Sequence, residues 1–233
     1  MAKSEPDDKE RPDHLGHRER LRERFLAGGA DALPDYEMLE LLLFMAQPRR
    51  DMKPVAKRLM TRFGTYAKVI SASSDELRTV EGVGESLIAT LKIVRDAAVR
   101  LARHELTQRN IISSWEDLIG YCRATMGREN VEQFRIFFLD RKNALIKDEE
   151  LQRGTVDQTA VYPREVIKRA LELHASAIIM AHNHPSGDTT PSRGDIEMTR
   201  LVKEACEKIG IALHDHVIIS AAGATSFRSL GLI

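Results

Sequence analysis

An apolar segment that ends in two alternate histidines constrains this chain more than any other feature. Residues 175–181 are almost entirely apolar, and His182, Asn183 and His184 follow directly. In a strand, residues two apart project to the same face, about 6.5–7 Å apart at the backbone. Two imidazoles that lean inward from such positions can converge on one ion, at about 2.0–2.1 Å each. The segment therefore predicts a buried strand that ends in a metal site.

The residues after the histidines offer a third ligand. Pro185 cannot continue a strand ladder, and residues 186–188 have turn chemistry. Ser192 is a good helix N-cap, which places Asp195 in a first helical turn, where its carboxylate can point back at the histidines. Two histidines and a carboxylate leave a fourth position open for water, as in catalytic zinc sites. Ser192 and Asp195 also fit a capping box, in which the carboxylate only accepts the Ser192 backbone N–H.

The spacing of these residues resembles a metalloprotease signature. The order H-x-H, Ser, two residues, Asp is that of the JAB/MPN (JAMM) metalloproteases, and the whole string resembles the RadC family of bacterial proteins, also called UPF0758. Further similarity lies at Glu132-Gln133-Phe134, Gly154-Thr155 and Asp215-His216, so that the resemblance covers most of residues 35–233. It implies an α/β fold: a mixed sheet of the JAB/MPN, cytidine-deaminase-like type, flanked by helices and preceded by a small all-α domain.

The resemblance also implies a metal and a base. One Zn2+ per chain is expected, held by His182, His184 and Asp195. A metal alone does not cleave an amide, because the attacking water must also lose a proton to a nearby base. JAB-type enzymes take this base from an early strand. Glu132 matches it by position, and Glu129 is the nearby competitor.

Other polar residues receive supporting roles by the same resemblance. Ser192 is expected to donate a hydrogen bond to the oxyanion. Asp215 and His216 are expected to lie beside the site, where a hydrogen bond to a ligand imidazole would fix its tautomer. Strand alternation leaves a rival open, since His214 and His216 would share one face and could form a second metal site. That rival lacks a third ligand nearby in the sequence.

The chain divides near residue 110 into a helical part and an α/β part. Residues 1–12 are polar and predict a disordered tail. Residues 13–108 carry only helical patterns. Residues 111–233 alternate strand and helix patterns, with a helix at 163–174 followed by a strand at 176–181. These patterns predict a small helical domain and then an α/β domain, which by the resemblance is expected to be a JAB/MPN metal-binding domain.

A segment of the helical part resembles a helix-hairpin-helix. A short capped helix meets Gly82-Val83-Gly84, and a long helix follows from Glu85. The glycines permit a tight reversal, and the backbone N–H groups at the start of the second helix can hold a phosphate. Such hairpins contact the DNA backbone without reading its sequence. Glu81 and Glu85 flank the hairpin and oppose phosphate, so a hairpin that only packs the two helices fits the sequence equally well.

The composition fits a cytoplasmic protein with no membrane partner. Lys and Arg together number 35, as do Asp and Glu, so no net charge draws the chain to nucleic acid. No apolar run approaches the ~20 residues that span a bilayer, and the N-terminus is charged, unlike a signal peptide. Cys122 and Cys206 form neither a disulfide framework nor a CxxC motif, which indicates reduced thiols.

Together these features predict a zinc-dependent hydrolase of peptide or isopeptide bonds. A metal-dependent nuclease is one alternative, although two-metal phosphoryl chemistry needs a second carboxylate cluster. A DNA-repair-associated DNA-binding protein or a non-catalytic adaptor is another. A zinc deaminase would need H-x-E and P-C-x-x-C motifs, which the chain lacks. The sequence leaves the substrate and the oligomeric state open.

Overall fold

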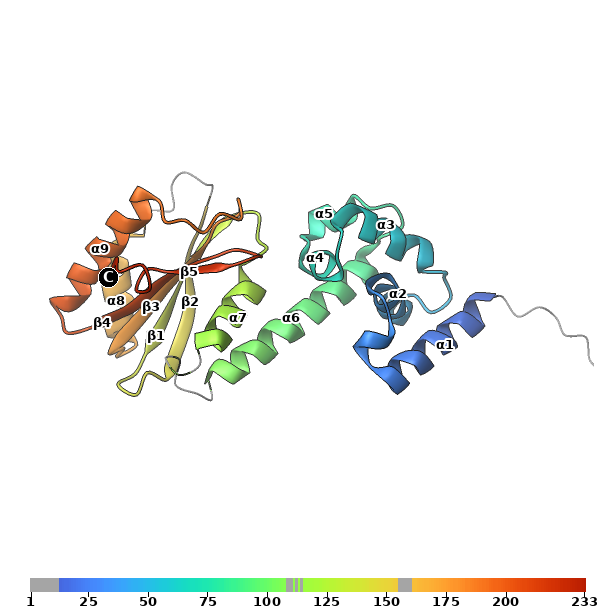
Figure 1. Cartoon of the computed structure of the whole chain (residues 1–233), viewed down its shortest axis with the longest axis horizontal. Helices are drawn as coiled ribbons and strands as arrows, with labels where there is room; N and C mark the ends of the chain where they lie inside the picture. Colours follow the sequence, from blue (N-terminus) through green and yellow to red (C-terminus); the bar gives the residue numbers. More distant parts are fainter. Residues whose placement is uncertain (1–12, 108–110, 112, 114, 155–160) are drawn as a thin grey trace, which may run out of the picture. The chain divides into compact units, whose positions relative to one another are not determined.

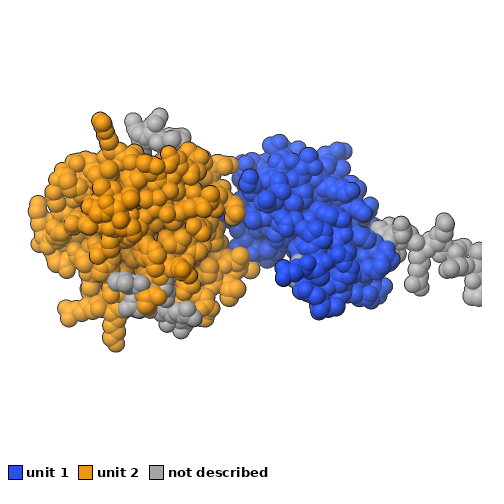
Figure 2. Space-filling view, in the orientation of Figure 1, with its two compact units in different colours: residues 1–96 blue, residues 97–233 orange. Residues whose placement is uncertain are grey.

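The computed structural model describes residues 13–107, 111, 113, 115–154 and 161–233. The predicted disordered tail, residues 1–12, and Thr155 lie outside the described residues. No helix in the described ranges is both long and apolar enough to cross a membrane. The chain separates into two compact units, residues 1–96 and 97–233 (Figure 2).

The first unit contains only helices among its described residues. They are α1 (Asp13–Gly28), the 3-10 helix η1 (Ala30–Ala32), α2 (Asp35–Ala46), α3 (Lys53–Phe63), α4 (Tyr66–Ser71), α5 (Ser74–Arg78) and the first part of α6 (Glu85–Thr107). Their apolar faces meet in one core, in which Leu39, Leu43 and Leu87 are fully buried. Ser73 and Glu76 form a capping box at the start of α5. The predicted all-α region is therefore confirmed.

Helix α6 continues from the first unit into the second. Its first part adds Leu87 and Leu91 to the core of the first unit, and its last part adds Leu106 to a core of the second. The division between the units consequently falls within α6, after residue 96. The sequence indicates a division near residue 110 instead, because the change from helix to strand patterns comes later than the change in packing.

The second unit is built on a five-stranded sheet (Figure 1). Its elements are α7 (Trp115–Thr125), β1 (Glu132–Leu139), β2 (Leu145–Gly154), α8 (Pro163–Glu172), β3 (Ala177–Asn183), α9 (Arg193–Glu207), β4 (Ala212–Ile219) and β5 (Ala224–Ser226). The strand order is β2-β1-β3-β4-β5. Only β3 and β4 are parallel, and the other neighbours are antiparallel. The predicted mixed sheet is confirmed.

Helices cover both faces of this sheet (Figure 1). Helix α7 and the end of α6 pack on one face, where Phe137, Ile179 and Val217 are buried. Helices α8 and α9 pack on the other, where Ile136 and Met180 are buried. Strand β3 lies in the centre, and each of its residues is buried. The α/β fold with flanking helices is therefore confirmed.

The connection from β3 to α9 begins where two parallel strands end. The carboxyl ends of β3 and β4 meet at one edge of the sheet, and open α/β sheets bind their ligands outside such ends. Strand β3 runs on to Asn183, past the end that the sequence predicts at residue 181. His182 is thus still paired, with Phe134 of β1 and Ile218 of β4. The ladder fixes the backbone from which this histidine projects.

Candidate metal centre

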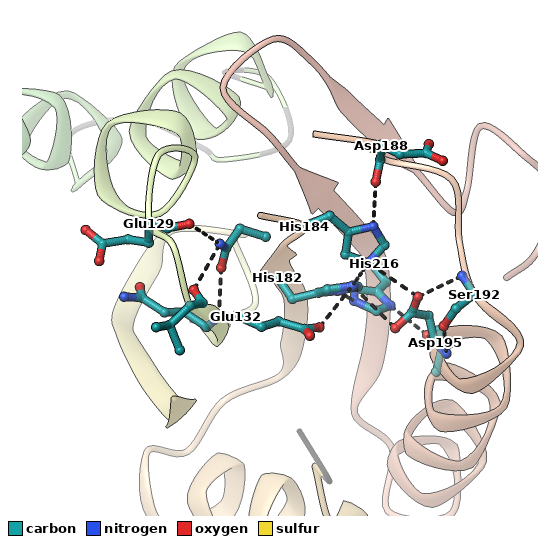
Figure 3. A network of polar contacts seen from close by, with 12 residues as sticks. Glu129, Glu132, His182, His184, Asp188, Ser192, Asp195 and His216 are labelled. Carbon is teal, nitrogen blue, oxygen red and sulfur yellow. Dashed lines mark hydrogen bonds and ion pairs between the residues drawn. The ribbon is translucent and has the colours of Figure 1, made fainter. Parts of the chain in front are cut away.

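Two histidines at the carboxyl end of β3 face one another. Nε2 of His182 lies 3.0 Å from Nε2 of His184. The residues are two apart, so their side chains project to the same side, and Figure 3 shows both imidazoles turned toward Asp195. His182 is 1% exposed, whereas His184 lies nearer the surface. The strand thus delivers two imidazole nitrogens to one point.

Asp195, in the first turn of α9, faces both histidines. Its Oδ1 lies 3.3 Å from Nε2 of His182, and its Oδ2 lies 3.6 Å from Nε2 of His184. The carboxylate also closes a capping box, because the Ser192 N–H donates to Oδ2 over 2.8 Å and the Asp195 N–H donates to Oγ of Ser192 over 3.1 Å. The capping box and the ligand geometry therefore coexist. The cap holds the carboxylate where it meets the histidines.

The fourth member of the cluster comes from the start of β1. Oε1 of Glu132 lies 3.9 Å from Nε2 of His182. One ligand atom from each of Glu132, His182, His184 and Asp195 lies within 4.8 Å of the others. The competing Glu129 turns its carboxylate away from the histidines (Figure 3). In the part of the chain that the structure describes, this is the one group of His, Cys, Asp and Glu that could hold a metal ion.

A chain of hydrogen bonds behind His182 fixes its tautomer. The hydroxyl of Thr199 has a single proton and donates it to the Asp195 carbonyl over 2.5 Å. Nδ1 of His216 lies 2.6 Å from the same hydroxyl and must therefore donate to it. Nε2 of His216 is left as an acceptor, so the Nδ1–H of His182 donates to it over 2.7 Å. Nε2 of His182 is consequently unprotonated and faces the cluster.

Burial keeps these two rings neutral. Loss of contact with water lowers the pKa of His182 to about 4 and brings the pKa of the fully buried His216 well below its ordinary value. His184 differs, because the carboxylate of Asp195 beside it raises its pKa. The Nδ1–H of His184 donates to the Asp188 carbonyl over 2.6 Å, which turns Nε2 of this ring toward the cluster as well.

The donor set fits one metal ion. Two Nε2 atoms that face each other at 3.0 Å need a cation beside them, either a proton or a metal ion. Ligand atoms about 2.0–2.1 Å from a tetrahedral zinc ion lie about 3.3 Å apart. The distances from His182 to His184 and to Asp195, 3.0 and 3.3 Å, are close to that value. Two imidazoles and a carboxylate are also donors of the kind that catalytic zinc sites use.

The two carboxylates of the cluster have opposite pKa shifts. Burial raises the pKa of Asp195, but the histidines beside it and the bonds with Ser192 outweigh burial and bring the pKa well below its ordinary value. Burial is also the main cause that raises the pKa of Glu132. Asp195 therefore stays ionised while Glu132 holds a proton more readily. This is the division expected between a ligand and a base.

Comparison with known proteins places the two units in one family. A family model described as a RadC-like JAB domain matches residues 112–232, which include the whole cluster. The chain is 56% identical over 217 residues to a UPF0758 protein of Ruegeria pomeroyi, covering 93% of this chain and 97% of the relative. The chain belongs to the RadC-like UPF0758 family. A UPF0758 protein of Rhodobacter capsulatus is also 56% identical, over 213 residues that cover 91% of this chain and 100% of the relative.

In this RadC-like domain, Asp215 and His216 lie on opposite faces of β4. His216 bonds to the imidazole of His182. The carboxylate of Asp215 instead accepts the backbone N–H groups of His216 and Arg228 and the hydroxyl of Ser226. These bonds secure the turn that follows β5. The structure therefore brings His216, but not Asp215, to an imidazole of the candidate cluster.

His214 does not join His216 in a second cluster. Strand β4 is irregular here, since Ile178 pairs with Leu213 but Ile179 pairs with Asp215. The extra residue breaks the alternation on which the rival metal site depends. Nε2 of His214 lies 2.7 Å from Oδ1 of Asn143. Among the described residues, no second group that could hold a metal includes His214.

Two residues of the site carry no clear signal in the sequence. Thr199 follows Asp195 by four positions on α9, the spacing that places two side chains on one helix face, and this spacing is the clue that could have found it. Asn183 stands between the histidines, where alternation turns it to the other face of β3. Its partners lie about fifty residues earlier in the chain, so no local pattern points to them.

The hairpin Gly82-Val83-Gly84 connects α5 to α6 in the first unit. It falls within residues 13–89, which match a family model described as UPF0758 N-terminal. Gly82 has φ +86, a conformation that favours glycine. Nε of Arg58 donates to the Glu81 carbonyl over 3.0 Å, and a guanidinium N–H of Arg50 donates to the Gly82 carbonyl over 3.4 Å. Two guanidinium groups therefore lie at this turn.

Proposed function

We propose that the chain is a zinc-dependent hydrolase of peptide or isopeptide bonds. The observation that carries the proposal is a second carboxylate, Glu132, which stands 3.9 Å from His182 in a cluster that already has three candidate ligands. A structural metal site is closed by its own ligands and has no use for a base. JAB domains are often metalloisopeptidases, which supports the same reaction class for this RadC-like domain.

Each residue of the cluster has a task in such a reaction. His182, His184 and Asp195 would hold zinc, which supplies Lewis acidity and lowers the pKa of a coordinated water toward about 7. Glu132 would take a proton from the attacking water and pass it to the leaving amine as the C–N bond breaks. Its pKa, raised by burial, suits a group that both accepts and releases a proton. The Ser192 hydroxyl accepts the Asp195 N–H and keeps its own proton to donate to the oxyanion.

The cluster favours amide hydrolysis over phosphodiester hydrolysis. Two-metal nucleases hold their ions about 3.5–4 Å apart and need carboxylates for both. In the described ranges there is one candidate group, and one of its two carboxylates is the proposed base. A single ion beside a base is the arrangement of metallopeptidases rather than of two-metal phosphoryl enzymes.

The purified full chain is expected to bind about one zinc per molecule and to cleave amide bonds in a library of peptides and isopeptides. Chelation should abolish cleavage, and one equivalent of zinc should restore it, because the base has no activated water without the ion. Elemental analysis measures the metal, and mass spectrometry measures the products. Chelator-sensitive cleavage of DNA without any amide cleavage would instead support the nuclease.

A second function, contact with the DNA backbone, is favoured by the two arginines at the hairpin. The side chains of Arg50 and Arg58 reach the turn. Each guanidinium has more N–H donors than the bond to its carbonyl partner uses. The negative charge of Glu85 opposes phosphate less strongly than the sequence indicates, because Nε of Arg78 donates to its carboxylate over 2.8 Å. Guanidinium groups beside free N–H groups at a helix start suit a phosphate. We propose that this hairpin holds DNA without reading its sequence.

Replacing Gly84 with aspartate is expected to weaken binding to duplex DNA by about 10–100-fold. Aspartate is a good helix N-cap, and a side chain at Gly84 meets open space, so the fold should be retained. Its carboxylate would repel the phosphate that the hairpin holds. Fluorescence anisotropy at two salt concentrations measures the loss.

Gly84→Ser is the matched control for this change, because serine also caps a helix but carries no charge. It should bind DNA better than Gly84→Asp. Gly82 is unsuitable, since an added Cβ would lie 3.0 Å from the side chains of Arg50 and Arg58. Equal binding by the wild type and Gly84→Asp would show that the hairpin only packs helices.

A further inference from the structure

Asn183 lies between His182 and His184 in the sequence, but it is not a member of the candidate metal cluster. Alternation along β3 turns its side chain to the opposite face. The residue is 1% exposed. A buried amide is costly unless its donors and its acceptor are all used, so its partners indicate what it is for.

The partners of Asn183 lie on both sides of Glu132 in the chain. Oδ1 of Asn183 accepts the Gln133 N–H over 2.7 Å. Nδ2 donates to the Val131 carbonyl over 3.2 Å and to the Glu129 carbonyl over 3.4 Å. One side chain therefore bonds to the backbone immediately before and immediately after the proposed base.

These bonds begin where the strand ladder ends. The pairing of β1 with β3 stops at Phe134 and His182. Glu132 is paired on its other side, with Gly154 of β2, but no ladder pair joins it to β3. Beyond the end of the ladder, the side chain of Asn183 bonds the first residues of β1 to the strand that carries the histidines.

We propose that Asn183 is a positioning residue that holds Glu132 at the metal-binding cluster by bonding the backbone on both sides of it. The kinetic part of this inference rests on the proposed function. This role requires an amide side chain, because its oxygen accepts the Gln133 N–H while its NH2 group donates to the carbonyls of Val131 and Glu129. An aspartate would keep the acceptor but turn a carboxylate oxygen toward the carbonyls of Val131 and Glu129.

Asn183→Asp and Asn183→Ala test the inference in the zinc-loaded full chain. Both variants should keep about one zinc, because His182, His184 and Asp195 are untouched. Turnover should fall by about 10–100-fold with little change in KM, since a base displaced by about 1 Å works poorly. Asn183→Asp keeps the size of the side chain and serves if the alanine variant does not fold. Asn143→Asp, the same change in the turn between β1 and β2, should keep full turnover.

Two readouts separate positioning from a general structural role. Hydrogen exchange should accelerate at the Gln133 amide, which loses its acceptor in Asn183→Ala, while the amides of Ile136 to Phe138 stay protected. In a double-mutant cycle, Asn183→Asp should cost little on top of Glu132→Gln, because a missing base cannot be misplaced. An additive loss, or loss of zinc, would overturn the assignment.

A crystal structure of zinc-loaded Asn183→Asp decides the inference independently of any substrate. The carboxylate of Glu132 should be displaced from the position that it takes beside His182. An unmoved carboxylate would overturn the inference even if the variant were inactive. If the wild type cleaves no amide bond, the proposed function fails, yet the position of Glu132 in this variant still tests what Asn183 does.

Discussion

Replacing Glu132 with glutamine is expected to lower turnover by about 10²–10⁴-fold while about one zinc per chain stays bound. Glutamine keeps the size of the side chain but cannot take the proton of the attacking water. Zinc should remain because the other three members of the cluster supply its ligands. Steady-state kinetics on a peptide cleaved by the wild type, with metal analysis of the same samples, measures both quantities.

Glu129→Gln separates the two candidate bases. It makes the same chemical change three positions earlier, at a carboxylate that turns away from the histidines (Figure 3). A larger loss of turnover for Glu129→Gln than for Glu132→Gln would contradict the assignment of the base. The same variant tests the adaptor alternative: a cell that tolerates Glu132→Gln but not Gly84→Asp would need the chain for binding DNA rather than for hydrolysis.

Short-range geometry explains how much of the site can be predicted from the sequence. Alternation places His182 and His184 on one side of a strand, Pro185 ends the ladder, and the cap at Ser192 places Asp195 in a first helical turn. Each step spans only a few residues, so the chain encodes it locally. The α/β pattern of the second unit and the helical first unit follow from similar local periods, whereas the mixed sheet is implied by the family resemblance.

Contacts between distant segments are what the sequence does not reveal. The tautomer of His182 depends on β4 lying parallel to β3, so that His216 reaches it, and on Thr199 of α9. Glu132 is placed by resemblance to JAB-type enzymes, and the bonds that hold it come from Asn183, fifty-one positions later. The irregularity of β4 is also not visible in the sequence, because a pattern of alternation does not show where an extra residue interrupts the pairing.

Short elements and helix ends are also poorly encoded. The sequence predicts neither α4 nor the three-residue strand β5, because each is too brief to show a period. Helix α8 ends at Glu172 rather than at His174, since His174 has φ +52 and cannot continue a right-handed helix. These differences leave the site unaffected, because its residues project from longer elements.

Replacing His182 with alanine is expected to weaken zinc binding by more than about 100-fold and to abolish hydrolysis with it. Nε2 of His182 is the centre of the cluster: it lies 3.0 Å from His184, 3.3 Å from Asp195 and 3.9 Å from Glu132. Without it, two candidate ligands remain beside the proposed base, and catalytic zinc sites use three. Competition with a chromogenic chelator measures the affinity.

Loss of the metal must be distinguished from loss of the fold. His182→Ala leaves Nε2 of the buried His216 without its donor, which costs about 1–3 kcal/mol in the free energy of unfolding. His184→Ala spares that bond, so it should lose zinc to a similar extent but unfold at a higher temperature in the metal-free state. His214→Ala is the matched control, because its ring bonds to Asn143 outside the cluster and zinc should be retained. Full zinc content in both cluster variants, or its loss in the control alone, would contradict the site.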